Sequence, residues 1–407
     1  MIGRGVIVAA VAVYLAVVGC VMWPADHTPR ASVGTVTESA TETAVGTGSG
    51  NAESLPAERD AGRDPAGQSN SLATPNADGP RPIGERAAAP GRSGLPYCGV
   101  AMQIQRIDLI NEYEKSIDEI AALGADTVSI VVDARQENGS SSRIFIDVRM
   151  TPTPEQLLEL IRHAKAKKLR VVLMPIVLLD NPRGNEWRGT IRPDSWTEWW
   201  DSYRQMQHHY AWIAQSAGVD LLVVGSELVS TEKYTDEWRR TIRDVRRTYK
   251  GQLTYSANWD HYNRVPFWDD LDLMGMNSYY KLGDNERVPV AEVVQRWKDI
   301  QNDLLAFQRK IGKPLILLEA GWCSLRNAAS EPWDYTRVGE PLDLELQRKL
   351  YEGFFEAWYG KESLGGFMIW EWPPGEGGMK DKGYTPEGKP AEKVMREWLG
   401  KPRWEVR

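Results

Sequence analysis

Residues 221–227 read Leu-Leu-Val-Val-Gly-Ser-Glu, and residues 315–322 read Leu-Ile-Leu-Leu-Glu-Ala-Gly-Trp. Each apolar run is typical of a buried strand, and each carries a glutamate near its end, Glu227 and Glu319. Burying a carboxylate costs free energy unless the group is paired or hydrogen-bonded. At the carboxyl end of a parallel strand, however, it reaches the edge of the sheet where α/β folds bind ligands. Two structural ion pairs with Lys or Arg are the alternative explanation.

Eight runs of this kind alternate with amphipathic segments from residue 99 onward. Each run is too apolar for a half-exposed strand, as expected for a parallel sheet that is covered outside and packed within. Eight consecutive βα units favour a single closed (β/α)8 TIM barrel over an open sheet. The predicted strands cover residues 99–105, 127–133, 170–178, 221–227, 252–259, 271–279, 315–322 and 365–372.

The starts of two helices can be predicted from capping signals. Thr153 precedes Pro154 and is followed by a glutamine at 156, which predicts an N-cap, a proline at N1 and a capping box. Ser195 and the glutamate at 198 predict the start of the next helix in the same way. The longer segment 134–152 is expected to hold an extra extended piece around residues 143–147.

The chain divides into three parts by composition. Residues 97–401 are long enough for one barrel domain. Residues 24–96 contain no aromatic residue and are rich in small, polar and charged residues. Such a segment cannot bury enough apolar surface to offset the entropy of ordering it. We therefore predict a disordered linker there.

Residues 1–23 predict attachment to a membrane. Arg4 precedes nineteen mostly apolar residues, which is just long enough to span a bilayer. Cys20, preceded by Val-Val-Gly, is an imperfect match to a bacterial lipoprotein cleavage site, so a lipoprotein signal is the alternative to an uncleaved anchor. Either way we expect the domain to be membrane-anchored and extracytoplasmic, in the periplasm or at the cell surface.

Charge and metal-ligating residues exclude some function classes. The net charge of −7 gives no electrostatic footprint for nucleic acid. The basic helix around residues 239–250 is interpreted as the solvated outer face of the barrel. Five histidines without a metal-binding motif predict no metal and no cofactor. Cys98 and Cys323 are expected at opposite ends of the barrel, too far apart to bridge. We expect a monomer.

The two glutamates and the aromatic composition together predict a carbohydrate ligand. Two carboxyl groups that converge on one cleft are the minimum apparatus for glycoside hydrolysis. Seventeen Trp against six Phe favour sugar binding, because a Trp face covers the apolar face of a pyranose. Trp259 and Trp322 follow predicted strands and are expected to line the rim of the cleft. Asn258, beside Trp259, is a candidate partner for a sugar hydroxyl.

Five stretches in order resemble glycoside hydrolases of clan A, and within that clan family 113, the endo-β-mannanase-like group. They are Val-Gly-Ser-Glu-Leu at 224–228, Thr-Tyr-Ser-Ala-Asn-Trp at 254–259, Met-Gly-Met-Asn-Ser-Tyr-Tyr at 274–280, Leu-Glu-Ala-Gly-Trp at 318–322 and Lys-Gly-Tyr-Thr-Pro-Glu-Gly-Lys-Pro-Ala at 382–391.

The resemblance implies a retaining mechanism on a polysaccharide, with β-mannan as the family's substrate. Glu319 would be the nucleophile and Glu227 the acid/base residue, with carboxyl groups about 5–5.5 Å apart. Tyr279 would donate a hydrogen bond to Glu319, and Trp370 would form the floor of the sugar site.

Two positions depart from the clan pattern. Ser226 replaces the asparagine that usually precedes the acid/base glutamate and binds the sugar. The strand at 170–178 is not followed directly by the Lys or His expected in mannanase-like members.

Asp133 and Arg135 follow the second strand and are expected to pair with each other. Glu371 is expected to point away from the neighbouring Trp370.

Two alternatives to a hydrolase remain open from the sequence. A non-catalytic carbohydrate-binding or envelope glycan-assembly protein could use the same barrel, since a fold does not fix a function. A transglycosylase would use the same two glutamates and would differ only in its acceptor. In each case the expected partner is a polysaccharide or an oligosaccharide.

Overall fold

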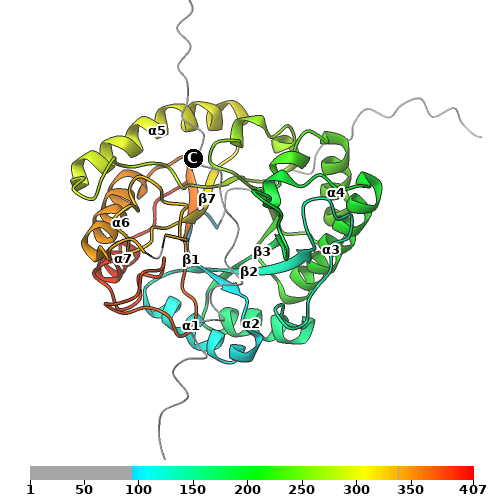
Figure 1. The fold of residues 1–407 in the computed structure, drawn as a ribbon, viewed down its shortest axis with the longest axis horizontal. Helices are drawn as coiled ribbons and strands as arrows, with labels where there is room; N and C mark the ends of the chain where they lie inside the picture. The colour runs from blue at the N-terminus through cyan, green and yellow to red at the C-terminus, as the bar shows by residue number, and fades with distance from the viewer. Residues whose placement is uncertain (1–93, 338) are drawn as a thin grey trace, which may run out of the picture. The chain divides into compact units, whose positions relative to one another are not determined.

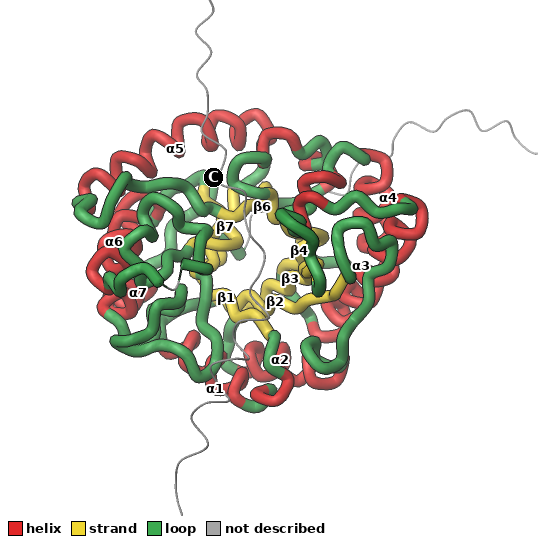
Figure 2. The backbone as a smooth tube through the Cα atoms, viewed as in Figure 1, coloured by secondary structure: helices red, strands yellow, loops and turns green. Residues whose placement is uncertain are grey.

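The computed structural model describes residues 94–337 and 339–407. Eight parallel strands pair in chain order and close into a barrel, with helices around the outside (Figures 1 and 2). All eight predicted strands are confirmed. Their bounds are β1 Tyr97–Ile104, β2 Thr127–Gln136, β3 Arg170–Leu179, β4 Leu221–Ser226, β5 Gln252–Ala257, β6 Met274–Asn277, β7 Leu315–Ala320 and β8 Leu364–Ile369.

Helices follow every strand but one. The α-helices are α1 Glu112–Ala122, α2 Pro154–Ala166, α3 Trp196–Ala217, α4 Thr235–Thr248, α5 Val290–Ile311, α6 Leu344–Trp358 and α7 Pro390–Leu399. Between β5 and β6 the structure has two short 3-10 turns, Tyr262–Arg264 and Trp268–Asp270, so the expected alternation of strand and α-helix is wrong there. The connection is short, and Pro266 lacks the N–H donor that a continuous helix would need.

The predicted capping signals act as expected. The Thr153 side chain accepts a hydrogen bond from the backbone N–H of Gln156, and the Gln156 side chain accepts from the N–H of Thr153, which completes the capping box of α2. Ser195 caps α3 by accepting a hydrogen bond from the N–H of Glu198. These bonds satisfy donors that the first helical turn leaves without an intrahelical partner.

Apolar side chains form two layers, one inside the barrel and one between strands and helices. The inner layer is formed by residues of β1 to β4, β7 and β8, among them Ala101, Val131, Met174, Val223, Ile316, Leu318 and Met368. The outer layer is richest in aromatic rings between α3, α4 and β5, including Trp199, Trp200, Tyr203, Trp238, Tyr255 and Phe267. The barrel is therefore a packed core, and any ligand site must lie at its ends.

Several predicted strands end earlier in the structure than in the sequence analysis. β4 stops at Ser226, β5 at Ala257, β6 at Asn277 and β8 at Ile369. The candidate site residues just beyond these ends therefore lie in loops at the carboxyl-terminal mouth of the barrel. The expected extended piece near residue 145 is a single antiparallel bridge between Arg135 and Phe145.

The predicted anchor and nearly all of the predicted linker, residues 1–93, lie outside the described residues. Within the described ranges, the structure contains no helix with the length and apolar character needed to cross a bilayer. Cys98 is the second residue of β1, and Cys323 follows β7. Both are buried free thiols.

The aromatic layer behind β4 generates a stability prediction. Trp238 is fully buried and its ring stacks on Phe267 with centroids 4.9 Å apart. We expect Trp238→Ala to lower the free energy of unfolding by about 3–5 kcal/mol, the usual cost of such a truncation. Trp212 on α3 is 49% exposed, so Trp212→Ala should change the free energy of unfolding by less than about 0.5 kcal/mol. Urea unfolding measures both, and equal midpoints for the two variants would contradict the packing argument.

Candidate active site

Glu227 is the first residue after β4, and its backbone is held in an unusual conformation. Its φ is +53°, a value that non-glycine residues rarely adopt and that often marks functional sites. Its N–H donates to the Ser256 carbonyl at 2.8 Å. Two tyrosines fix the chain on either side: Tyr203 Oη donates to the Val224 carbonyl at 2.6 Å, and Tyr255 Oη accepts from the N–H of Leu228 at 2.9 Å.

Both carboxylate oxygens of Glu227 accept hydrogen bonds from protein side chains. Asn277 Nδ2 donates to Oε1, and Arg188 Nη2 donates to Oε2 in an ion pair. Asn277 is itself fixed, because its Oδ1 accepts from the backbone N–H of Trp259 at 2.8 Å. Glu227 is only 6% exposed. Its carboxylate is therefore held by direct hydrogen bonds to protein side chains.

Glu319 lies on β7 and faces the same mouth. Tyr279 Oη donates to Glu319 Oε2 at 2.8 Å, as predicted from the resemblance. Burial raises the pKa of Glu319, and the negative charge of Glu227 raises it further, while Arg188 and the Tyr279 hydroxyl oppose both effects. The two glutamates therefore interact electrostatically across one site, as the sequence analysis expected of a convergent pair.

Arg188 is the cation shared by the two glutamates, and the sequence analysis did not find it. Burial lowers the pKa of its guanidinium, but the charges of Glu227 and Glu319 outweigh burial and raise that pKa above its usual value. Arg188 begins a 3-10 turn, Arg188–Thr190, well beyond the end of β3. A Lys or His was expected directly after β3, whereas the loop brings an Arg to the cleft nine residues after the end of that strand.

The turn that carries Arg188 is rigidly built. Thr190 Oγ1 accepts from the N–H of Trp187 at 3.0 Å, and the N–H of Thr190 donates to the Trp187 carbonyl at 2.8 Å. Gly189 is required because a Cβ there would come within 2.3 Å of the Trp187 ring. The backbone of Arg188 is thus fixed, and this directs its side chain to Glu227.

The predicted aromatic residues fall into two groups. Trp370 follows β8 and packs on the inner apolar layer, and its role as the floor of the sugar site stays a prediction. Trp259 stacks on Trp333 with centroids 6.0 Å apart, beyond the end of β5. Trp322 is fully buried against Tyr351 and other rings of the outer layer. The prediction that Trp322 lines the cleft is therefore wrong, because its ring faces the helices.

The remaining predicted polar residues are all at the mouth but nearly inaccessible. Ser226 and Asn258 are each 1% exposed. Asn258 Oδ1 accepts from the N–H of Trp259 at 3.0 Å, so one of its polar atoms shapes the loop. Asp133 and Arg135 form the predicted ion pair, with Nε and Oδ2 2.5 Å apart.

Glu371 follows Trp370 just beyond the end of β8. Burial raises its pKa to about 8, and the charges of Glu376 and then Glu319 act in the same direction. It was expected to point away from the cleft, but the chain has already left β8 at this residue, so strand alternation no longer applies. Glu371 is a third carboxyl group on the β8 side of the mouth.

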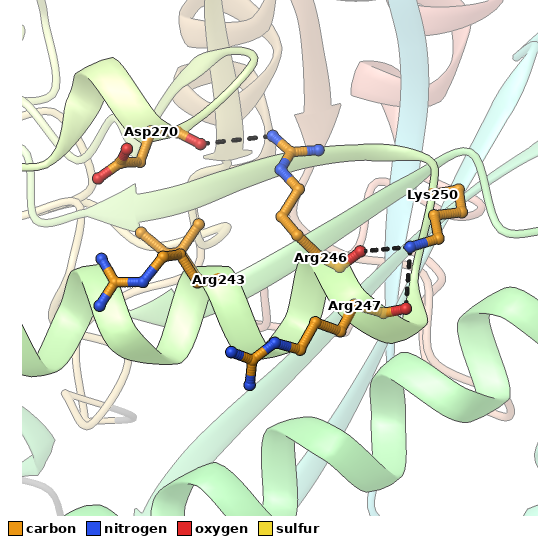
Figure 3. Close-up of a pocket in the computed structure, with 6 residues that line it drawn as sticks. Arg243, Arg246, Arg247, Lys250 and Asp270 are labelled. Carbon is orange, nitrogen blue, oxygen red and sulfur yellow. Dashed lines mark hydrogen bonds between the residues drawn. The ribbon is translucent and has the colours of Figure 1, made fainter. Parts of the chain in front are cut away.

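A hollow on the outer face of α4 does not belong to this site (Figure 3). Arg246 donates to Asp272 at 2.7 Å, and Lys250 Nζ donates to the carbonyls of Arg246 and Arg247 near the helix end. A stripe of the helix that includes Trp238, Thr241 and Val245 is buried. The basic residues thus cover a solvated outer face, as predicted, and stabilise the end of α4.

Among the residues that the structure describes, no group of three or more His, Cys, Asp or Glu is arranged to hold a metal ion.

Comparison with known proteins finds one matching family and several similar structures. The sequence profile of Glycoside Hydrolase Family 113 matches residues 109–389. The β-mannanase of that family from Alicyclobacillus acidocaldarius is 29% identical, with a TM-score of 0.68 over 75% of this chain and 98% of the other. A family 113 β-1,4-mannanase is 27% identical, with a TM-score of 0.67 over 76% of this chain and 100% of the other.

More distant structures share the fold. The β-glucuronidase of Bifidobacterium dentium is 13% identical, with a TM-score of 0.51 over 77% of this chain and 47% of its own. No protein of curated function matches the chain in sequence.

Proposed function

The chain belongs to glycoside hydrolase family 113, and from this premise we propose that it is a retaining β-glycosidase that cleaves a β-linked polysaccharide of the mannan type. The observation that carries the proposal is the pair Glu227 and Glu319 at the ends of β4 and β7, with Arg188 bonded to Glu227 and its charge acting on both carboxyl groups. The two family β-mannanases support the linkage type, since each matches over nearly its whole length.

In the first step of the proposed reaction, Glu319 acts as the nucleophile. Its carboxylate attacks the anomeric carbon as the bond to the leaving oxygen breaks, and Glu227 gives a proton to that oxygen. A covalent glycosyl-enzyme forms with inverted configuration at the anomeric carbon. The Tyr279 hydroxyl holds Glu319 Oε2 during the attack, which fixes the direction from which the carboxylate approaches.

In the second step, Glu227 changes from acid to base. It takes a proton from water, and the water oxygen attacks the anomeric carbon as the bond to Glu319 breaks. Two inversions give net retention. Trp370, which packs on the floor of the mouth, offers an apolar face for the sugar ring in this site.

The decisive experiment is hydrolysis of a panel of β-mannan, β-glucan and xylan, with the anomeric configuration of the first product read by NMR. We expect cleavage of β-mannan with retention. An initial product of inverted configuration would overturn the mechanism. Transfer of the glycosyl group to an added sugar in preference to water would identify the protein as a transglycosylase.

Replacing each glutamate separately should give different defects. Glu319→Ala should abolish turnover, because no glycosyl-enzyme can form. Glu227→Ala should still be glycosylated by an aryl β-mannoside whose leaving group needs no proton, and should then stall. Added azide needs no general base, so it should restore turnover and yield a β-glycosyl azide. The measurement is steady-state kinetics with product analysis; unchanged activity of Glu227→Ala would refute its role.

The pKa of Glu319 gives a prediction about pH. Glu319 must be ionised to attack, so activity is lost as the pH falls through its pKa. The Tyr279 hydroxyl favours the ionised form, so Tyr279→Phe should raise that pKa and move the acidic limb of kcat/KM upward by about one pH unit. A pH profile of both enzymes on an aryl β-mannoside measures the shift. An acidic limb at the same pH in both would show that the Tyr279 bond does not tune Glu319.

A further inference from the structure

The backbone conformation of Glu227 is set by two hydrogen bonds to β5. The φ and ψ angles of a residue follow from the orientation of the two rigid peptide planes on either side of its Cα. The first plane is held because the N–H of Glu227 donates to the Ser256 carbonyl at 2.8 Å. The second is held because the N–H of Leu228 donates to Tyr255 Oη at 2.9 Å. Two consecutive residues of β5 thus keep Glu227 at its positive φ.

The second of these bonds depends on the direction of a hydroxyl group. A phenolic oxygen can both donate and accept, whereas a backbone N–H can only donate. The Tyr255 oxygen must therefore turn a lone pair toward Leu228 and its single proton toward another group. Glu232 takes that proton, since its Oε1 accepts from Tyr255 Oη at 2.9 Å. Glu232 therefore sets the direction in which the hydroxyl faces.

The ring of Tyr255 has little freedom of its own. It packs against the Trp238 ring with centroids 5.2 Å apart and against the Phe267 ring with centroids 5.4 Å apart. Leu228 is held as well, because its carbonyl accepts from the N–H of Thr231 at 2.8 Å and from its Oγ1 at 2.7 Å. In a close-packed layer the O–H bond is the part of Tyr255 that can still rotate, and its rotation is what Glu232 restrains.

Glu232 is a carboxyl group in an environment that disfavours its charge. It is buried at the end of the 3-10 turn Val229–Thr231, which follows Glu227. Burial raises its pKa to about 7, whereas the hydrogen bond from Tyr255 and the charge of His261 act in the opposite direction. Such a group adds little to stability by itself, because its lost hydration offsets what its bonds contribute. Its bond to Tyr255 therefore serves orientation more than stability.

We propose that Glu232 is a positioning residue for the acid/base glutamate and that it acts through the Tyr255 hydroxyl. The inference rests on the proposed function, because it requires Glu227 to act as acid and base. Glu232 accepts the Tyr255 proton, and this leaves the phenolic oxygen to hold the N–H of Leu228. The peptide plane after Glu227 then keeps its orientation, and the carboxyl group stays where a leaving oxygen can meet it.

Loss of the Glu232 acceptor should impair only the steps that need the acid/base residue. The Tyr255 proton can then turn toward Leu228, the bond is lost, and Glu227 relaxes from its positive φ. A displaced acid slows the departure of a poor leaving group, which must be protonated, but not that of an activated one. A displaced base slows hydrolysis of the glycosyl-enzyme whatever the leaving group was. A protein that is merely less stable would lose activity equally on every substrate.

The test compares Glu232→Leu with the wild type, both as the full chain, on two aryl β-mannosides. Phenyl β-mannoside has a poor leaving group, and we expect its kcat/KM to fall at least about tenfold, part of the roughly 10²–10⁴ that a positioned acid contributes. Dinitrophenyl β-mannoside is activated, and its kcat/KM should change by less than about threefold. Its kcat and KM should fall together, because the glycosyl-enzyme accumulates. Azide should raise kcat of the variant far more than that of the wild type and yield a β-glycosyl azide.

Three further variants separate positioning from packing. Glu232→Gln keeps an acceptor oxygen on a side chain of the same size, so its kcat/KM on phenyl β-mannoside should lie within about threefold of the wild type. Phe267→Leu loosens the layer against the Tyr255 ring and leaves the hydroxyl in place, so it should lower the midpoint of thermal unfolding and affect both mannosides equally. Tyr255→Phe should reproduce the kinetic pattern of Glu232→Leu, and it replaces that variant if Glu232→Leu does not fold.

The inference and the proposed function fail in different ways. Equal losses on both mannosides in Glu232→Leu, or no response of that variant to azide, would overturn the positioning role while Glu227→Ala still responds to azide. A Glu232→Gln variant as defective as Glu232→Leu would also overturn it, because the acceptor oxygen would then not be what matters. If Glu227→Ala itself does not respond to azide, the acid/base assignment fails. If the wild type hydrolyses neither mannoside, the proposed function fails.

Discussion

Two buried carboxylates cannot lie at the same mouth of a barrel without a cation to offset their repulsion and their loss of hydration. Arg188 supplies that charge: it pairs with Glu227, and its field lowers the pKa that burial and Glu227 raise in Glu319. The rest of the site depends on this arrangement. Tyr279 and Asn277 each hold one glutamate from the end of β6, so the short sixth strand connects the two halves of the pair.

The packed wall of the barrel makes this cluster possible, because it holds the irregular backbone of the site in place. Pairing between β4 and β5 shifts register next to Ser226, and pairing between β6 and β7 shifts next to Asn277. Glu227 then takes a positive φ. Such irregularities persist only if the surroundings over-determine them. The aromatic layer does so here: a Cβ at Gly225 would lie 2.7 Å from the Trp238 ring, so β4 is pressed directly on that layer.

The features that could be predicted from the sequence are those with local, periodic signals. Buried strands, capped helices and glutamates at strand ends each leave such a signal, and the resemblance added Tyr279 and Trp370. Arg188 leaves no such signal, because the sequence of a long loop does not show whether an arginine faces solvent or a carboxylate. Trp322 was misplaced for the reverse reason: its position after β7 indicated the cleft, but the chain turns its ring into the packing against α6.

The carboxylates of the site and the charge that offsets them come from different parts of the fold. The glutamates, Asn277 and Tyr279 are carried by or directly follow strands, and the packed layers behind them leave little freedom to move. Arg188 is carried by a loop whose backbone is fixed by the Trp187–Thr190 turn, and its side chain reaches Glu227 from there. In this arrangement the two carboxylates are carried by strand ends, and the positive charge that offsets them is carried by a loop.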